Sequence, residues 1–393
     1  MKRPFLFSVF ALIPIFISFS CIASDIDVQI APHSLVNQTS SSVVTVTVTN
    51  TGTNAVYIPK SLSPFYAPSN HLMTKIFKVT DASGKEVPFT GRMVRVAPRD
   101  PDTYFFKIDA GKSMSQDIDL STDYDLTTAG TFQVSYTQGY TLTIHMDADG
   151  EIDSDYNYQA SQSVSIWIAP PKTGASSHSM ALSQPTQTSD GQQCTSAQTT
   201  TIRAAALEAY NVSLNALQGI ETLYTVVQSE DSSGTPIYQG RIKDDATYTT
   251  WFGPTQNTGG VYYSKPSYTD YWRTNVDFEM IHFMNSIALR IGAGNYLCGC
   301  PGYDSRTAAW TIPQTRTITF CEGFFNLKQS DGFYDSQVLT LIHEVSHYVD
   351  TWGEGTGDYA YGHQGARSLA AKDKFNAVKN ADNIMYYEGT YIH

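Results

Sequence analysis

Hydrophobic and polar residues follow two different periods along this chain. From about residue 25 to residue 169 the pattern is that of short strands, as in Ser42–Thr49, where Val44, Val46 and Val48 alternate with polar residues. After residue 193 alanine and leucine recur at helical spacing, beginning with Thr199–Leu217. The pattern predicts an N-terminal region made of strands and a C-terminal region made mostly of helices.

The N-terminal region is predicted to be an antiparallel β-sandwich. Its strands are short, rich in β-branched residues and separated by turns such as Asp81–Gly84, at a spacing of about 8–12 residues. No convincing helix occurs in this region. The predicted strands are Ser42–Thr49, Lys75–Val79, Glu86–Phe89, Thr103–Ile108, Met114–Leu120, Gly130–Tyr136, Thr141–His145 and Val164–Ile168.

The C-terminal region is predicted to be a mostly α-helical α+β domain. Helices are expected over Thr199–Leu217, Met280–Ile291 and Val338–Val349, with a short strand over Arg316–Cys321. Residues 171–193 are rich in proline, serine, glutamine and glycine, which predicts a linker or processing segment between the two regions. The predicted organisation is therefore 1–24, 25–170, 171–193 and 194–393.

The first 24 residues have the pattern of a secretory signal peptide. Lys2 and Arg3 precede an apolar run that ends in Ile22-Ala23-Ser24, small residues at the positions that a signal peptidase requires. The alternative is a lipoprotein signal with Cys21 as the lipidated residue, which the residues before Cys21 fit poorly. We therefore expect a secreted protein, and no other stretch reaches the ~18 apolar residues of a membrane span.

The cysteine count predicts disulfides, and the net charge excludes some classes of binding partner. Cleavage after residue 24 would remove one of five cysteines and leave Cys194, Cys298, Cys300 and Cys321, an even number that predicts two disulfides with three possible pairings. The 25 basic and 37 acidic side chains give a net charge of −12, which argues against a nucleic-acid partner and against a basic membrane-binding surface.

An acidic loop in the N-terminal region is partly similar to a calcium site. Asp147, Asp149, Gly150 and Asp153 have some of the spacing of a calcium-binding loop, but histidine and tyrosine stand at its first and last ligand positions. The favoured interpretation is an acidic hairpin turn.

The motif that carries chemistry is His343-Glu344-Val345-Ser346-His347. Two histidines four residues apart lie on one face of a helix and can bind the same Zn²⁺ ion. Glu344 is then placed to take a proton from a water molecule at the metal. The simpler alternative is a pair of surface histidines on an amphipathic helix.

A catalytic zinc needs a third protein ligand, and the residues alone leave two candidates. Asp358 follows His347 by 11 residues, after a glycine-rich turn that lets the chain fold back towards the metal. His363 is the competing candidate. The metzincin pattern fails because Asp350 and Gly353 stand where it needs glycine and histidine. Glu354 and Glu388 are poorly placed for a gluzincin ligand.

Two spaced motifs together resemble the aspzincins, the family of deuterolysins and peptidyl-Lys metalloendopeptidases. The HExxH motif at 343–347 is followed by Gly355-Thr356-Gly357-Asp358-Tyr359-Ala360-Tyr361-Gly362, which is similar to the family's GTxDxxYG pattern. The resemblance implies a zincin-type catalytic domain with one Zn²⁺, Asp358 as the third ligand and Tyr361 as the donor to the oxyanion. The turn after His347 is longer than expected of the fungal members.

The resemblance extends to other parts of the chain. Asn380-Ala381-Asp382-Asn383 is similar to an element whose aspartate, here Asp382, lines the S1′ pocket of lysine-directed members. A carboxylate there would favour lysine or arginine, while the alternative role of Asp382 is to cap a helix. The resemblance also implies the pairs Cys194–Cys298 and Cys300–Cys321, and an N-terminal propeptide like that of bacterial aspzincins.

These residues predict a secreted, monomeric zinc endopeptidase made as a precursor. Zinc at His343, His347 and Asp358 would activate a water for Glu344, with protein or peptide substrates bound against an edge strand, for which Arg316–Cys321 is the candidate. The N-terminal region would act as an intramolecular inhibitor and folding aid. The linker offers Pro171-Lys172 as a cleavage site that the enzyme itself could use.

Two other functions remain open from the sequence alone. One is a secreted binding or adhesion protein in which zinc is only structural, and the other is a metallohydrolase that acts on a bond other than a peptide bond. The presence of Glu344 and Tyr361 beside the histidines argues against the first, and substrate assays are needed to exclude the second.

Overall fold

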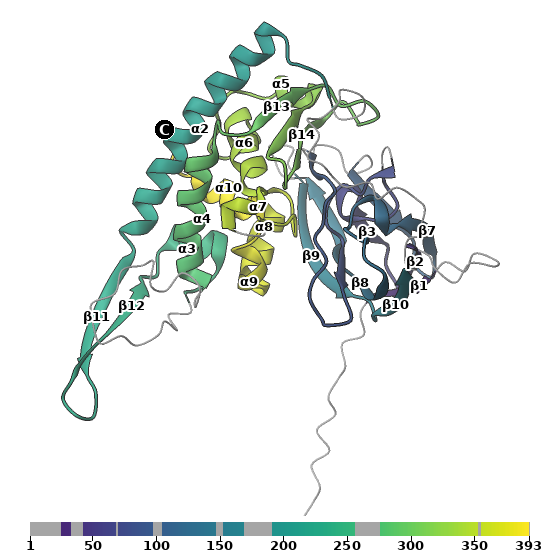
Figure 1. The fold of residues 1–393 in the computed structure, drawn as a ribbon, viewed down its shortest axis with the longest axis horizontal. Helices are drawn as coiled ribbons and strands as arrows, with labels where there is room; N and C mark the ends of the chain where they lie inside the picture. Colours follow the sequence, from purple (N-terminus) through teal and green to yellow (C-terminus); the bar gives the residue numbers. More distant parts are fainter. Residues whose placement is uncertain are drawn as a thin grey trace, which may run out of the picture.

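The computed structural model describes residues 25–32, 42–67, 70–96, 104–146, 152–168, 191–255, 276–352 and 355–392. Two bodies lie side by side (Figure 1): an N-terminal β body, residues 25–168, and a C-terminal body, residues 191–392. Among the described residues, no helix has the length and apolar character needed to cross a bilayer.

The N-terminal β body contains two sheets that share one core. The first has the order β1-β2-β7, and the second contains β10-β8-β3-β6, with β4 and β9 also paired to β8. Every second residue of β2 points inward. Val44, Val46 and Val48 are fully buried and pack in one cluster with residues of β3, β4 and β8 from the second sheet. The strands are β1 (Ile26–Pro32), β2 (Val43–Asn50), β3 (Val56–Pro59), β4 (Phe77–Thr80), β6 (Phe105–Ile108), β7 (Ser113–Asp119), β8 (Gly130–Met146), β9 (Ile152–Ala160) and β10 (Val164–Ile168).

The C-terminal body combines helices with a sheet and a hairpin. Helices α2, α4, α6 and α10 pack around one apolar core, which the strands β13, β14 and β15 flank. The helices are α2 (Ser196–Glu221), α3 (Ala246–Phe252), α4 (Val276–Arg290), α5 (Glu322–Phe325), α6 (Gln337–Ser346), α7 (Val349–Trp352), α8 (Gly362–Lys372), α9 (Lys374–Ala377) and α10 (Ala381–Gly389). The strands are β11 (Tyr224–Glu230), β12 (Pro236–Ile242), β13 (Asn295–Cys298), β14 (Thr307–Ile312) and β15 (Thr317–Phe320).

One strand of the N-terminal β body belongs to the sheet of the C-terminal body. Strand β5 (Met93–Val96) pairs antiparallel with β14, so the sheet has the order β13-β15-β14-β5. A second contact forms where α8 packs against β9 (Figure 1). An apolar cluster also contains side chains of both bodies. The two bodies therefore associate through main-chain hydrogen bonds as well as through apolar side chains.

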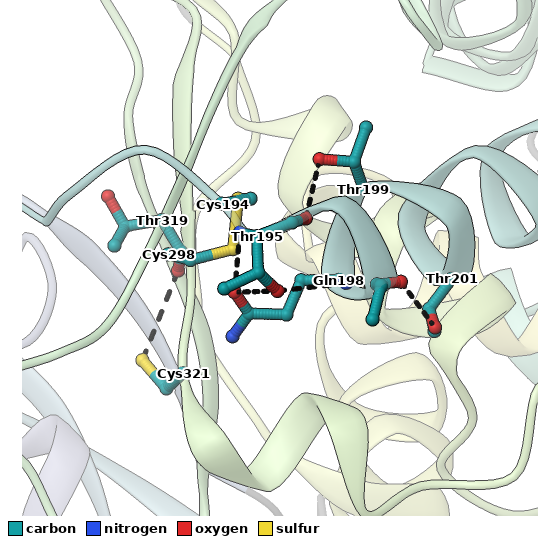
Figure 2. Close-up of a disulfide and its surroundings, with 9 residues drawn as sticks. Cys194, Thr195, Gln198, Thr199, Thr201, Cys298, Thr319 and Cys321 are labelled. Carbon is teal, nitrogen blue, oxygen red and sulfur yellow. Dashed lines mark hydrogen bonds between the residues drawn. A yellow bond between two sulfur atoms is a disulfide. The ribbon is translucent and has the colours of Figure 1, made fainter.

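Two disulfides brace the start of the C-terminal body. They join Cys194 to Cys298 and Cys300 to Cys321, the pairs that the family resemblance implies. Figure 2 shows the first of them beside the N-terminus of α2, where Thr195 and Gln198 form a capping box: the Thr195 hydroxyl accepts from the Gln198 amide, and the Gln198 side chain accepts from the Thr195 amide. Cys194–Cys298 ties the start of α2 to the end of β13, and Cys300–Cys321 joins the segment after β13 to the residue that follows β15.

Three sequence expectations need correction. The C-terminal body is a mixed α/β structure, and the expectation of a mostly helical domain is not supported, because β11–β15 lie between its helices. Segment Arg316–Cys321 contains β15, which lies between β13 and β14 and is therefore a central strand instead of an edge strand. Segment Glu86–Phe89 forms only isolated bridges, to Thr80 and Tyr124.

Other expectations fall on residues outside the described part of the chain. These are the signal peptide 1–24, Pro171 and Lys172 with the linker up to residue 190, and Asp147, Asp149 and Gly150 of the acidic loop.

The core of the C-terminal body contains a carboxyl group that should make stability depend on pH. Glu388 is fully buried, its Oε2 accepts from the Ser213 hydroxyl at 2.5 Å, and burial raises the pKa of Glu388 to about 8. A raised folded-state pKa adds stability that is complete below the unfolded pKa, about 4.5, and is lost as pH rises through about 8. We expect Glu388→Gln to lose less stability between about pH 6 and pH 9 than the native protein, measured as urea midpoints.

The matched control is Glu221→Gln, at the exposed end of α2. It should leave the native pH dependence unchanged. Parallel midpoint curves for Glu388→Gln and the native protein would contradict the expectation.

Candidate metal and catalytic centre

Helix α6 presents the two histidines. It begins after the N-cap Ser336, whose hydroxyl accepts from the Leu339 amide at 3.2 Å, and it ends with His347 as the C-cap. Every residue of the helix is buried, so His343 and His347 face into the protein on one side of it. Helical geometry therefore brings the two imidazole rings together, with centroids 4.8 Å apart.

A tight turn returns the chain from α6 to Asp358. Gly355 has φ of 73°, and a Cβ atom at this position would lie 2.2 Å from the His347 carbonyl oxygen, so only glycine fits. Asn380 holds the next part of the loop, because its Oδ1 accepts from the amides of Tyr359 and Ala360 at 2.7 and 3.1 Å. The turn thus places the Asp358 carboxylate opposite the two histidines.

Three ligand atoms converge in this buried space. His343, His347 and Asp358 each offer one atom, and the three atoms lie within 4.8 Å of one another. Asp358 Oδ1 is 3.2 Å from Nε2 of His343 and 3.4 Å from Nε2 of His347. None of the three atoms has a hydrogen-bond partner among the described residues.

The outer partners of the histidines favour a metal at this point. Nδ1 of His343 is 2.7 Å from Asp382 Oδ1, and Nδ1 of His347 is 3.1 Å from the Thr356 carbonyl oxygen. When Nδ1 donates to these oxygens, each Nε2 has a free lone pair directed at the Asp358 carboxylate. Two nitrogen lone pairs and a carboxylate oxygen repel one another unless a cation lies between them, so this donor set fits one Zn²⁺ ion.

Electrostatics at the ligands is consistent with a buried cation. For His343, burial and the Arg95 charge lower the pKa, but Asp358 and Asp382 outweigh them and raise it to about 9. This imidazole therefore needs a proton or a cation on its Asp358 side at neutral pH. Burial lowers the pKa of His347 to about 4, which keeps that ring neutral as a metal ligand must be.

Glu344 lies beside the ligands in a position suited to a general base. It is fully buried, and its Oε2 accepts from the Thr311 hydroxyl of β14 at 2.5 Å. Its Oε1 has no hydrogen-bond partner among the described residues. Burial raises the pKa of Glu344 to about 7, in the range where a carboxylate can both accept and release a proton near neutral pH.

Tyr361 contacts a main-chain carbonyl from the N-terminal β body. Its hydroxyl donates to the Val94 oxygen at 3.0 Å, and its ring stacks near His343 with centroids 6.2 Å apart. Burial raises the pKa of Tyr361 well above its usual value, so the phenol stays protonated as a hydrogen-bond donor.

Asp382 meets a positive charge, but the charge comes from the chain itself. The Arg95 guanidinium, on β5, donates through Nη1 to Asp382 and through Nη2 to Asp335. Arg95 and Asp382 are almost completely buried, and Asp335 is 10% exposed. Burial would raise the pKa of Asp382, but the Arg95 charge outweighs it and holds the pKa well below its usual value.

The sequence did not identify Arg95 or Asp335. Both are single charged residues without a motif, and only the fold brings them to Asp382. The alternative ligands lie elsewhere: His363 packs against Trp251, Phe333 and Tyr386, and Glu388 bonds to Ser213 in the helical core. Neither is in the metal cluster that the described residues form, and Glu354 lies outside those residues.

Comparisons with known proteins agree with this centre. Residues 238–389 match the aspzincin family model, described as lysine-specific metallo-endopeptidase. The chain is 28% identical to peptidyl-Lys metalloendopeptidases of Grifola frondosa, over 88% of this chain and 86% of that protein, and of Armillaria mellea, over 96% and 98%. Residues 238–389 belong to the aspzincin family. This aspzincin is a zinc metalloendopeptidase.

Two further relatives extend the comparison. An extracellular protease of Aeromonas hydrophila is 25% identical over 88% of this aspzincin and 86% of its own length. The solved zinc peptidase from Grifola frondosa covers 50% of this chain and 97% of its own, at 26% identity and a TM-score of 0.38.

We expect the native aspzincin to bind one Zn²⁺ and Asp358→Ala to bind it far more weakly. Loss of a direct ligand should lower the affinity by more than the roughly tenfold to hundredfold cost of losing an outer partner. Competition with a chromophoric chelator measures this affinity. The matched control is His363→Ala, which should retain the native affinity. Loss of zinc from His363→Ala, with retention by Asp358→Ala, would reverse the ligand assignment.

Proposed function

We propose that this aspzincin is a secreted endopeptidase that cleaves before lysine or arginine and is made as a precursor inhibited by its N-terminal β body. The observation that carries the proposal is the Arg95 side chain on Asp382, next to the metal ligands. We infer that Arg95 occupies the place that the P1′ arginine side chain of a bound substrate would take.

Each residue of the centre has one role in the proposed reaction. His343, His347 and Asp358 hold zinc, which when bound supplies a Lewis acid and a more acidic water. Glu344 takes the proton of the attacking water through its free Oε1 and delivers it to the leaving nitrogen. Tyr361 donates to the carbonyl oxygen, as it does to Val94, and this bond strengthens as negative charge develops. A purely structural zinc site would have no use for these two side chains.

The S1′ pocket is proposed to contain two carboxylates. Asp382 and Asp335 each accept from one end of the Arg95 guanidinium, and both stand on the C-terminal body. A planar guanidinium can donate to two separate acceptors at once. The ammonium of lysine is a compact charge on a flexible four-carbon chain and lacks this forked geometry. Asp382 would therefore select for positive charge, and Asp335 would add affinity for arginine.

The N-terminal β body is proposed to act as the inhibitor because it contacts several residues of this centre and the edge of the adjacent strand. Strand β5 occupies the edge of β14, and Val94 takes the Tyr361 hydroxyl. Thr74 contacts the second oxygen of Asp358 at 3.4 Å. A substrate strand and β5 would both pair with the same edge of β14, so a substrate could not bind while β5 is in place. Release would follow cleavage in the linker, for which Pro171-Lys172 remains our proposed site.

The test of the function is digestion of casein by the matured enzyme, with cut sites read by mass spectrometry. We expect cuts before lysine and arginine that stop with a zinc chelator and return with Zn²⁺. Glu344→Gln should lower kcat by at least about a hundredfold, because the general base is lost while zinc stays bound. Cleavage that resists both the chelator and Glu344→Gln would contradict the proposal.

The role of Asp335 predicts a difference between two substrates. In the matured enzyme, Asp335→Asn should lower kcat/KM by about tenfold or more for a peptide with P1′ arginine, because one charged hydrogen bond to the guanidinium is lost. The same peptide with P1′ lysine serves as the matched control and should change by less than about threefold. An equal loss for both peptides would show that Asp335 does not distinguish them.

A further inference from the structure

Strand β5 has two features expected of a bound substrate: its pairing with β14 and the position of the Arg95 charge. It runs antiparallel to β14, with Val94 opposite Trp310 and Arg95 opposite Ala309. The Tyr361 hydroxyl donates to the Val94 carbonyl oxygen, and the next side chain, Arg95, reaches the two carboxylates. In a bound substrate, the residue whose carbonyl meets the oxyanion donor is P1, and the residue after it is P1′.

We propose that the Val94–Arg95 peptide bond occupies the scissile position of the precursor and is the first bond that the zinc-loaded precursor hydrolyses in itself. The proposal rests on the proposed function of this centre and names its internal substrate. In the reaction, a water oxygen bonds to the Val94 carbonyl carbon and the carbon–nitrogen bond to Arg95 breaks. Val94 keeps the new oxygen as a carboxylate, and the two water protons leave Arg95 with an ammonium group.

Space for solvent lies close to the proposed scissile bond, beside the residue that precedes it. A cleft of about 360 Å³ lies between the two bodies, and its lining includes His347, Thr356 and Tyr359 of the C-terminal body and Phe89 and Met93 of the N-terminal one. Met93 directly precedes Val94, so the cleft opens beside the metal ligand and the P2 position. A space of this size can hold several water molecules, so the proposed hydrolytic water would come from this side of β5.

Cleavage at this bond would not free the active site. Strands before the bond pair with strands after it: β2 with β7, β3 with β6 and β4 with β8. Both sides also contribute to one apolar core. The new ends at Val94 and Arg95 would therefore stay on β14, and the nicked N-terminal β body would remain bound until the linker is cut.

The experiment uses the full precursor with Glu344 intact, purified in chelator and then given Zn²⁺. Denaturing mass spectrometry should find a fragment that ends at Val94 and one that begins at Arg95, before any cut in 171–193. The four cysteines paired in the structure all follow Arg95, so no disulfide joins the two fragments. The rate should be first order and independent of protein concentration, and the fragments should elute together from a native sizing column.

Four variants separate the pocket from the rest of the interface. Glu344→Gln should abolish the cut, Arg95→Lys should retain it, and Arg95→Ala should slow it at least about a hundredfold, because the pocket carboxylates lose their partner. The matched control is Arg92→Ala. Arg92 also reaches across the interface, with its guanidinium 4.4 Å from the Trp310 ring centroid and bonded to the Tyr303 hydroxyl at 2.9 Å, but it does not enter the pocket. Arg92→Ala should be cut within about threefold of the native rate.

A second measurement tests, in the absence of catalysis, whether Arg95 holds β5 against β14. In zinc-free Glu344→Gln protein, adding Arg95→Ala should speed hydrogen exchange at the β5 and β14 amides, and adding Arg92→Ala should speed it less. Unchanged exchange in the Arg95→Ala protein would contradict the anchoring role.

The inference and the proposed function can fail separately. A precursor that cuts its linker or casein while Val94–Arg95 stays intact would overturn the inference and leave the endopeptidase function standing. Absence of zinc-dependent cleavage in the precursor, in its linker and in casein would overturn both.

Discussion

The centre depends on one buried carboxylate, that of Asp382. Its Oδ1 contacts Nδ1 of His343, its Oδ2 accepts from the Gly362 amide at 2.6 Å, and Oδ1 also accepts from Arg95. One side chain therefore orients a metal ligand, fixes the start of α8 directly after Tyr361, and binds the charge in the pocket. A fully buried carboxylate is costly unless several donors surround it. The charged group in the pocket, whether Arg95 or a substrate side chain, completes that set of donors.

In the proposed function, this arrangement would link folding, inhibition and substrate binding through the same atoms. The edge of β14 needs a partner strand, because unpaired main-chain groups at a sheet edge readily accept another chain. In the structure β5 supplies that partner, and Val94 and Arg95 bind Tyr361 and the carboxylates of Asp382 and Asp335. Under the proposed function, a substrate would replace this strand with chemically equivalent groups.

The ligands that could be predicted from sequence are those whose positions follow from the spacing of nearby residues. HExxH fixes two ligands because a helix repeats every 3.6 residues, and the glycine-rich turn indicates Asp358 because Gly355 must adopt positive φ. Val44, Val46 and Val48 likewise predicted a strand through their alternation. Resemblance to the family was needed for Tyr361 and Asp382, since a tyrosine and an aspartate are each compatible with many environments.

The rest could not be predicted because it depends on contacts between distant segments. The sequence predicts Arg316–Cys321 as the edge strand, but pairing order is a property of the whole sheet. In the structure β15 lies between β13 and β14, and β14 is the strand that pairs with β5. Met93–Val96 carries no strong strand pattern, and its conformation comes from pairing with β14. Arg95 and Asp335 are separated by 240 residues, so no local pattern connects them.

The most direct test of this account is a crystal structure of the zinc-loaded Glu344→Gln precursor, in which the internal bond should remain intact. The account predicts zinc on His343, His347 and Asp358, the Val94 carbonyl at Tyr361, and the Arg95 guanidinium between Asp382 and Asp335. A precursor with zinc bound but with β5 detached from β14, and with the Arg95 side chain in solvent, would contradict it.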